Sequence, residues 1–106
     1  MIKISSESLE FVKVLVEAKR DGAAFDPTYK VVEMAFTAGS DPDANEWNAG
    51  TWETETLPHG EEKYFARCFV GPGGTVELDE GVYQVWVRIN VIPEIPVLQA
   101  GKIRVI

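Results

Sequence analysis

The chain is poor in the residues that cross-link proteins and that most often carry catalysis. Among its 106 residues there are one cysteine, Cys68, and one histidine, His59. A single cysteine excludes an intramolecular disulfide, so we expect the chain to fold in a reducing compartment. Cys68 lies in the strand-like stretch 66–70, where a small buried apolar role is expected. His59 lies in a turn-like stretch, and no motif places a second catalytic group beside it.

Basic residues are also few. The chain has 10 lysines and arginines against 17 aspartates and glutamates, a formal net charge of -7. Because phosphate binding needs a basic face, this balance argues against nucleic acid and against an anionic membrane as partners. No apolar run is long enough to cross a bilayer, and residues 1–5 lack the apolar core of an export signal. We therefore expect synthesis in the cytoplasm.

What the chain does contain is a globular composition with period-two patterning. Hydrophobic residues make up 45% and charged residues 25%, which is typical of one folded domain, here spanning residues 1–106. The clearest alternation is in residues 82–90, where Tyr83 and Val85 lie on one side and Gln84, Trp86 and Arg88 on the other. Similar patterns predict strands at residues 10–18, 30–37, 64–70 and 102–106, and shorter ones at 2–5, 50–55 and 74–78.

Turn-forming residues separate these strands and define the fold class. Clusters of glycine, proline and aspartate occur at 19–22, 39–42, 71–74 and 79–81. Residues 91–96 contain two prolines and suit a stiff connection before the last strand. Residues 6–11 are the only possible helix, and they are too few to form a stable one. About seven short strands in one domain predict an all-β, immunoglobulin-like antiparallel β-sandwich with Greek-key connections.

One local motif strengthens this prediction. Asp79, Gly81 and Tyr83 place a tyrosine at the start of a late strand, just after a turn. This arrangement resembles the tyrosine corner of Greek-key sandwiches, in which the hydroxyl bonds to backbone a few residues upstream. We expect these three residues to have a structural role at the end of the sandwich.

Two stretches resemble ligand sites without completing them. Residues 41–46 carry oxygen-bearing side chains at alternate positions, as calcium loops do, but Glu46 stands where glycine is needed and Trp52 where the closing glutamate is needed. The glycine-rich stretch 71–74 precedes a strand pattern and not a helix, so it indicates a turn. We therefore expect no metal site, no cofactor and no catalytic residue, with a hydrolase based on His59 as the weakest alternative.

The three tryptophans are the best candidates for a binding role. Trp86 is flanked on its strand face by Gln84 and Arg88, and Trp47 and Trp52 lie in or beside a polar loop. Tryptophan and arginine are typical anchors of protein interfaces, so these five residues are the predicted partner-binding set. Two alternatives remain open: Trp47 or Trp52 plugs an end of the core, or the exposed rings stack on sugars as in carbohydrate-binding modules.

The strand and turn sequences also resemble a known family. Residues 31–37, 64–72 and 81–89, followed by 93–97 and a closing strand at 101–103, resemble small virion proteins encoded among the head and tail genes of actinobacterial tailed bacteriophages and prophages. The resemblance implies a non-enzymatic structural protein of the virion, located at the head–tail junction or decorating the capsid. It supplies no functional residues.

That resemblance implies portal or connector, capsid or tail proteins as partners, and a homo-oligomer is a further possibility. Edge strands of a sandwich offer unpaired backbone groups for docking, and we expect the first and last strands to be such edges. The C-terminal stretch 103–106 reads Ile-Arg-Val-Ile and is apolar at its last residue, so we expect it to be buried or covered by a partner.

Overall fold

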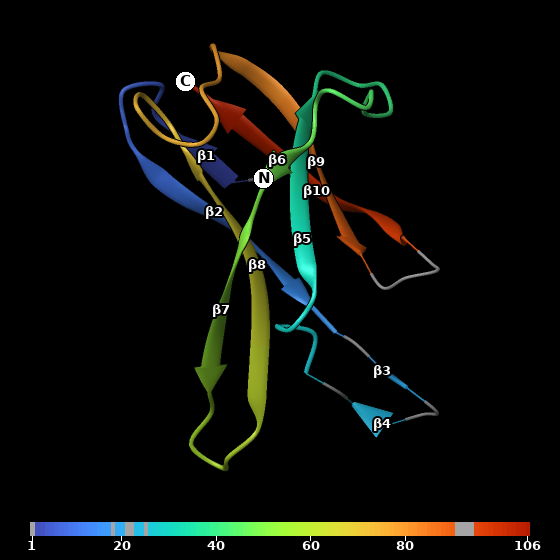
Figure 1. Cartoon of the computed structure of the whole chain (residues 1–106). Coiled ribbons are helices and arrows are strands. Elements are labelled where there is room, and N and C mark those ends of the chain that lie inside the picture. Colours follow the sequence, from blue (N-terminus) through green and yellow to red (C-terminus); the bar gives the residue numbers. More distant parts are fainter. Residues whose placement is uncertain (1, 18, 21–22, 25, 91–94) are drawn as a thin grey trace.

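The protein is all β in every part of the chain that the computed structural model describes, residues 2–17, 19–20, 23–24, 26–90 and 95–106 (Figure 1). Two stacked sheets hold eight of the strands, and a small hairpin holds the other two. The strands are β1 Ile2–Ile4, β2 Glu10–Val16, β3 Lys19–Arg20, β4 Ala23–Ala24, β5 Val31–Thr37, β6 Asn48–Ala49, β7 Thr51–Thr56, β8 Glu62–Val70, β9 Gly81–Asn90 and β10 Val97–Val105.

The strand order is that of an immunoglobulin-like sandwich. The first sheet, which we call sheet A, has the order β1-β10-β9-β5-β6, and sheet B has the order β2-β8-β7. Between the strands that the structure describes, every pairing is antiparallel except that of β1 with β10. Strands β2, β8 and β7 take the places of strands B, E and D of an immunoglobulin domain, and β5, β9 and β10 those of C, F and G. The predicted fold class is therefore confirmed.

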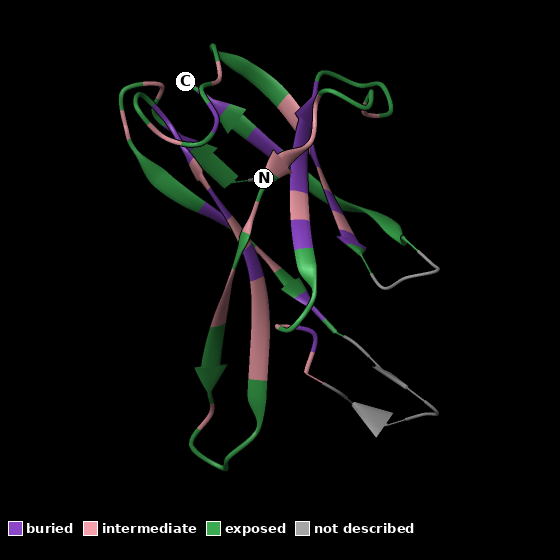
Figure 2. Ribbon diagram, in the orientation of Figure 1, coloured by how far each residue is buried: buried purple, intermediate pink, exposed green. Residues whose placement is uncertain are grey.

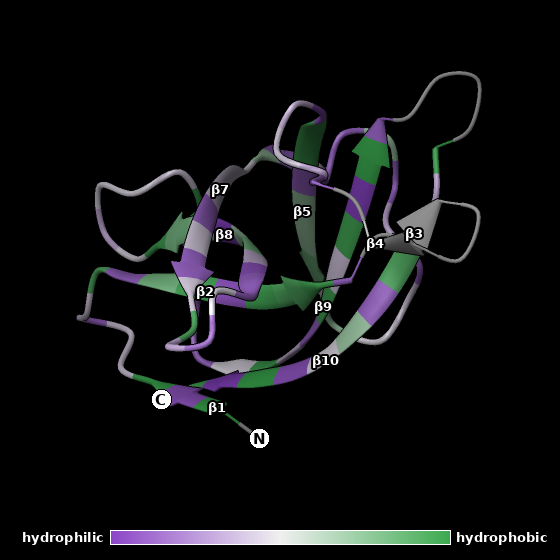
Figure 3. Ribbon diagram, turned by 90° about the horizontal axis from the view of Figure 1, so that it is seen from below, coloured by the Kyte–Doolittle hydropathy of each residue, from purple (hydrophilic) through white to green (hydrophobic). Residues whose placement is uncertain are grey.

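The core lies between the two sheets and follows the predicted alternation. Inward positions of β5, β8 and β9 are buried, and the residues between them are mostly half-buried or exposed (Figure 2). Met34 is fully buried between Val32 and Phe36 on the inward side of β5. Each such side chain contributes about 1.5 to 3 kcal/mol by leaving water. The same two-residue alternation of polar and apolar colour runs along β9 and β10 in Figure 3.

The tyrosine corner forms as the sequence predicts. The Tyr83 hydroxyl donates a hydrogen bond of 2.8 Å to the backbone carbonyl of Asp79. Tyr83 also packs against the core cluster from its half-buried position at the start of β9. Gly81 lies against its ring, where an added Cβ would stand 3.7 Å from a ring carbon. This contact fixes the entry of the chain into β9 after the turn from sheet B.

Glycine is required at the end of β8. Gly71 has a φ of 137°, and a Cβ there would collide with the backbone carbonyl oxygen of Ser8. The turn predicted at 71–74 is present, with the Gly74 N–H donating to the Gly71 carbonyl at 2.9 Å. The turn brings Val76 back to β8, where its N–H donates to the Phe69 carbonyl at 3.1 Å.

Some predicted elements were wrong. Residues 74–78 are not a strand: only Val76 forms a bridge, because the tight turn folds the segment back on β8. Residues 6–11, judged too few for a stable helix, indeed form none: they contain a turn at residues 6–7 and the start of β2 at Glu10. The last strand begins at Val97, not Lys102, since a bulge between Gln99 and Gly101 lets pairing with β9 continue past the glycine. Three predicted stretches fall partly outside the described residues: the strand at 10–18, within which β2 spans Glu10–Val16, the turn at 19–22 and the connection at 91–96.

The prediction that the last strand is an edge strand was also wrong. Strand β1 pairs with β10 through Ile2–Ile103 and Ile4–Val105, so β1 is the edge and β10 lies inside sheet A. Ile103 and Val105 are buried by the chain's own core, whereas Ile106 remains 56% exposed.

Candidate functional site

Four of the five predicted binding residues lie together on the outer face of sheet A. Gln84, Trp86 and Arg88 alternate along β9 with inward-facing buried residues, and Trp47 directly precedes β6 at the edge of the same sheet. Strand register places Trp86 between Ala35 of β5 and Gln99 of β10. We call this surface the tryptophan face: Glu33, Ala35, Thr37, Trp47, Gln84, Trp86, Arg88 and Gln99.

Trp86 is held firmly against the sheet. Its indole Nε1–H donates to the Thr37 hydroxyl at 2.9 Å, and that hydroxyl donates to the Ser40 carbonyl at 2.6 Å. Thr37 is 2% exposed, and Ala35, opposite Trp86, is fully buried. The ring is half-buried, so the side chain is fixed in one orientation while part of it faces solvent.

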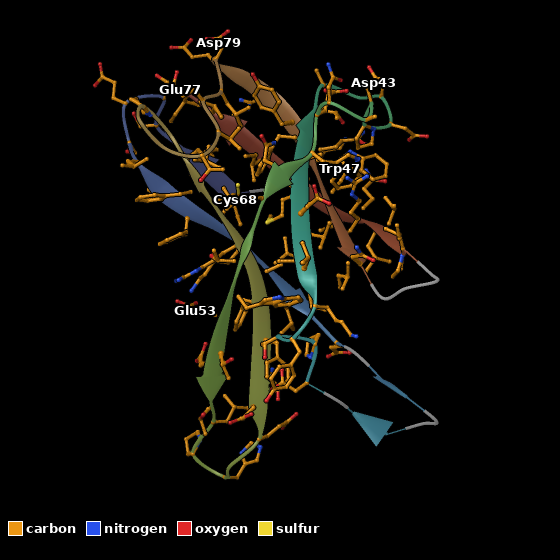
Figure 4. All side chains as sticks on the ribbon, in the orientation of Figure 1. Asp43, Trp47, Glu53, Cys68, Glu77 and Asp79 are labelled. Carbon is orange, nitrogen blue, oxygen red and sulfur yellow. The ribbon has the colours of Figure 1, made fainter. Side chains whose placement is uncertain are left out.

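Arg88 links the two tryptophan-bearing parts of the face. Its Nε donates to Glu33 Oε1 at 3.0 Å, and its guanidinium lies 4.5 Å from the centre of the Trp47 ring. An arginine held by both a carboxylate and an aromatic ring loses little further side-chain entropy when a partner binds. Figure 4 shows Trp47 on the side of the molecule opposite Glu53 of sheet B.

A basic strip continues the tryptophan face toward β1. Lys102 pairs with Gln84, Arg104 with Val82, and Lys3 with Arg104, so these three basic residues share the outer side of sheet A. All three are exposed, and within the described part of the chain none of them forms an ion pair. An acidic chain thus presents a positively charged strip beside its tryptophans. The sequence patterns did not reveal this strip, although Lys102 and Arg104 lie on the same side of the strand predicted at 102–106.

Trp52 lies elsewhere. It belongs to β7 of sheet B, packs against the core cluster, and donates its Nε1–H to the Lys30 carbonyl at 2.9 Å. The cause is Gly50, whose N–H donates to the Val32 carbonyl and at which a Cβ would stand 3.2 Å from the Arg67 carbonyl oxygen. The chain crosses from sheet A to sheet B at this narrow point. Trp52 therefore takes the alternative role of a core plug.

The outer face of sheet B is a second surface, which sequence reasoning did not select. Phe11 of β2 stacks on Phe69 of β8 with ring centres 4.5 Å apart, and the Arg67 guanidinium lies 4.2 Å from the centre of the Phe11 ring. Arg67 and Lys13 both pair with Glu53, at 3.2 and 2.7 Å. The pairing with Lys13, first by its hydrogen bond, lowers the pKa of Glu53. We call this surface the phenylalanine face: Phe11, Lys13, Leu15, Glu53, Phe65, Arg67 and Phe69.

The alternation predicted for residues 64–70 already placed the two phenylalanines of β8, Phe65 and Phe69, on the same side of their strand.

The lone histidine and cysteine have local partners. His59 is exposed near the tip of the β7–β8 hairpin, 2.9 Å from Glu61, and this hydrogen bond lowers the pKa of the Glu61 carboxyl. Cys68 is 2% exposed between the sheets, which confirms its predicted role as a buried filler. Burial raises the pKa of its thiol, so little reactive thiolate forms near neutrality.

The acidic stretches form loops and a shallow hollow. In the 41–46 loop the Glu46 carboxylate accepts a hydrogen bond of 2.9 Å from the Asp43 N–H. A hollow of about 510 Å³ lies at the end of the sandwich where Figure 4 labels Glu77 and Asp79. Among the residues that the structure describes, no three side chains are grouped as metal ligands. The same residues include no helix of the length and apolarity needed to span a membrane.

Comparison of the chain with protein-family models, with curated proteins and with solved structures found no match. The surfaces described above are therefore the basis for a functional proposal.

Proposed function

We propose that this protein is a non-enzymatic structural protein of a tailed bacteriophage particle, an immunoglobulin-like module that docks on proteins of the head–tail junction or capsid. The observation that carries the docking role is the tryptophan face, where Trp86, Arg88 and Trp47 lie together on one sheet surface. The assignment to a virion comes from the resemblance of the strand and turn sequences to small phage virion proteins.

The chemistry of the tryptophan face suits a protein partner. Tryptophan and arginine are enriched among the residues whose replacement by alanine weakens protein interfaces most. Here both are held in place before binding, Trp86 by Thr37 at 2.9 Å and Arg88 by Glu33 at 3.0 Å. The neighbouring basic strip of Lys3, Lys102 and Arg104 favours a partner surface that carries carboxylates.

A carbohydrate ligand is the second candidate, because two half-buried tryptophans share one face. Sugar stacking needs an accessible ring face. One face of Trp47 is already occupied by the Arg88 guanidinium, and the Trp86 indole N–H is bonded within the chain. These contacts favour the protein partner. Titration of tryptophan fluorescence with cell-wall and storage glycans tests the alternative, and saturable quenching would support it.

The proposal is tested by gel filtration of the purified chain with the capsid and connector proteins encoded beside it. We expect co-elution with one of them. Gln84→Arg places a bulky charge on the tryptophan face and breaks the 2.8 Å hydrogen bond between Gln84 and Gln99. Its matched control is Thr51→Arg, which breaks the 3.1 Å bond to Arg67 and adds the same side chain to the outer side of sheet B.

Binding that is lost in Gln84→Arg and kept in Thr51→Arg would support the tryptophan face as the docking surface. Failure of the unmodified chain to co-elute with any of these proteins, or neighbouring genes that encode no head or tail proteins, would overturn the proposal.

A further inference from the structure

Strand β2 is a long unpaired edge of sheet B. The sheet order β2-β8-β7 leaves one side of residues 10–16 without a neighbouring strand, and backbone groups on that side have no partner among the described residues. In an edge strand these groups point outward and accept a further strand. The strand that precedes β2 does not cover it, because β1 pairs with β10 of the other sheet.

The other edges of the sandwich differ from β2 in composition or length. β7, at the far edge of sheet B, reads Thr-Trp-Glu-Thr-Glu-Thr, and its glutamates discourage pairing with another chain. In sheet A the edge strands β1 and β6 have three and two residues, and the part of β10 that β1 leaves uncovered, residues 97–102, is interrupted by the bulge between Gln99 and Gly101. β2 has seven residues, Glu-Phe-Val-Lys-Val-Leu-Val, with five apolar side chains, no proline and no glycine. It is the described edge with the least protection against strand addition.

We propose that a second copy of this chain occupies the β2 edge. The two β2 strands pair antiparallel about a two-fold axis, which joins the two B sheets into one sheet of the order β7-β8-β2-β2-β8-β7. This edge suits its own copy because its length matches, its charges Glu10 and Lys13 cancel, and the rest of its side chains are apolar. The resulting interface is the same patch on both copies, as a two-fold dimer requires.

Side-chain direction and charge limit the possible registers. Outer residues of one copy must face outer residues of the other, because a shift by one residue would turn every side chain to the wrong side. Pairing Lys13 with its own counterpart would place like charges opposite each other, which is unfavourable. A two-fold axis at Val12 avoids this and sets Lys13 opposite Phe11 and Leu15 opposite Leu9 of the second copy.

This register also covers apolar surface that a single copy leaves in water. Leu9, Phe11 and Leu15 are each 43 or 44% exposed, and all three come together across the proposed axis. Phe11 is already stacked on Phe69, so the ring that meets Lys13 of the second copy is held in position. The phenylalanine face then continues across both copies without a break.

The test measures the mass of the full chain by analytical ultracentrifugation over the micromolar to millimolar range. We expect reversible dimers. In the dimer, Leu15→Lys places one lysine opposite Leu9 in each copy, so two charges face apolar side chains. The dissociation constant of the dimer should therefore rise by about tenfold or more. The matched control is Thr54→Lys on the β7 edge of the same sheet, also an exposed position, which should leave the dimer unchanged.

The register is tested by cross-linking. A Leu9→Cys, Leu15→Cys double variant should give covalent dimers on mild oxidation, while Leu15→Cys alone should not, since Leu15 does not face its own counterpart. A chain that stays monomeric over the whole range, or a dimer equally weakened by Leu15→Lys and Thr54→Lys, would overturn the inference. The docking proposal is independent of this result, because it concerns the opposite face and is measured with a different protein.

Discussion

The outer faces of the two sheets use the same combination of residues in different settings. On sheet A, Arg88 lies over Trp47 and bonds to Glu33; on sheet B, Arg67 lies over Phe11 and bonds to Glu53. In both cases an arginine of a strand inside the sheet joins an aromatic ring to a carboxylate on a neighbouring strand.

The difference lies in what surrounds each combination. On sheet A, Trp86 bonds to the buried Thr37 beneath it, so the face is an extension of the packed structure. On sheet B, Glu53 is shared between Arg67 and Lys13, and Phe11 lies on an unpaired edge strand. The comparison indicates that the tryptophan face is held rigidly by the packed structure, whereas the phenylalanine face includes a strand that has a neighbour on only one side among the described residues.

The largest expected effect comes from removing the anchor of each face. Trp86→Ala should lower the free energy of unfolding by about 2 to 3 kcal/mol, because it uncovers Ala35 and leaves the buried Thr37 hydroxyl without its donor. Phe11→Ala, at a position 44% exposed, should cost about 1 kcal/mol or less. Urea unfolding followed by circular dichroism at low protein concentration measures both. Equal losses would contradict the proposed difference in rigidity.

A smaller effect is expected from the two arginines. Arg88→Ala leaves Glu33 without its ion-pair partner and Trp47 without its cation, and should cost roughly 1 kcal/mol. Arg67→Ala should cost about half of that, since Lys13 still holds Glu53 at 2.7 Å. The same unfolding measurement compares the two variants. A larger loss for Arg67→Ala than for Arg88→Ala would contradict this prediction, because it would mean that the arginine on sheet B stabilises the fold more than the arginine on sheet A.

The smallest expected effect is on how the free energy of unfolding depends on pH in acid. The pKa of Glu53 lies below its usual value of 4.5, chiefly through the Lys13 hydrogen bond. The unfolded chain therefore takes up this proton first, so the stabilisation by Glu53 is complete above pH 4.5 and is lost as the pH falls through the lower folded-state pKa. Glu53→Gln should make stability fall less steeply over this acid range in pH-dependent unfolding. An unchanged slope would show that the Lys13–Glu53 pair contributes nothing.

Sequence patterns predicted local features well and connections poorly. The alternation in 82–90 correctly placed Gln84, Trp86 and Arg88 on one side of a strand, and the Asp79–Tyr83 motif predicted a hydrogen bond that is present. The strand predicted at 74–78 was wrong, because hydrogen bonds of a tight turn outweigh the strand preference of those residues. Trp47 and Trp52 were indistinguishable in sequence, since both flank the same polar loop.

The sequence by itself determined which side chains share a side of each strand, because successive residues of a strand point to opposite faces wherever the strand lies. It also determined the tyrosine corner, whose two partners are four residues apart. Only the tertiary structure decided which strands are neighbours: the crossing at Gly50 separates Trp52 from Trp47, and the pairing of β1 with β10 leaves β2 uncovered. These outcomes depend on hydrogen bonds and close packing between residues far apart in the chain, which no local pattern encodes.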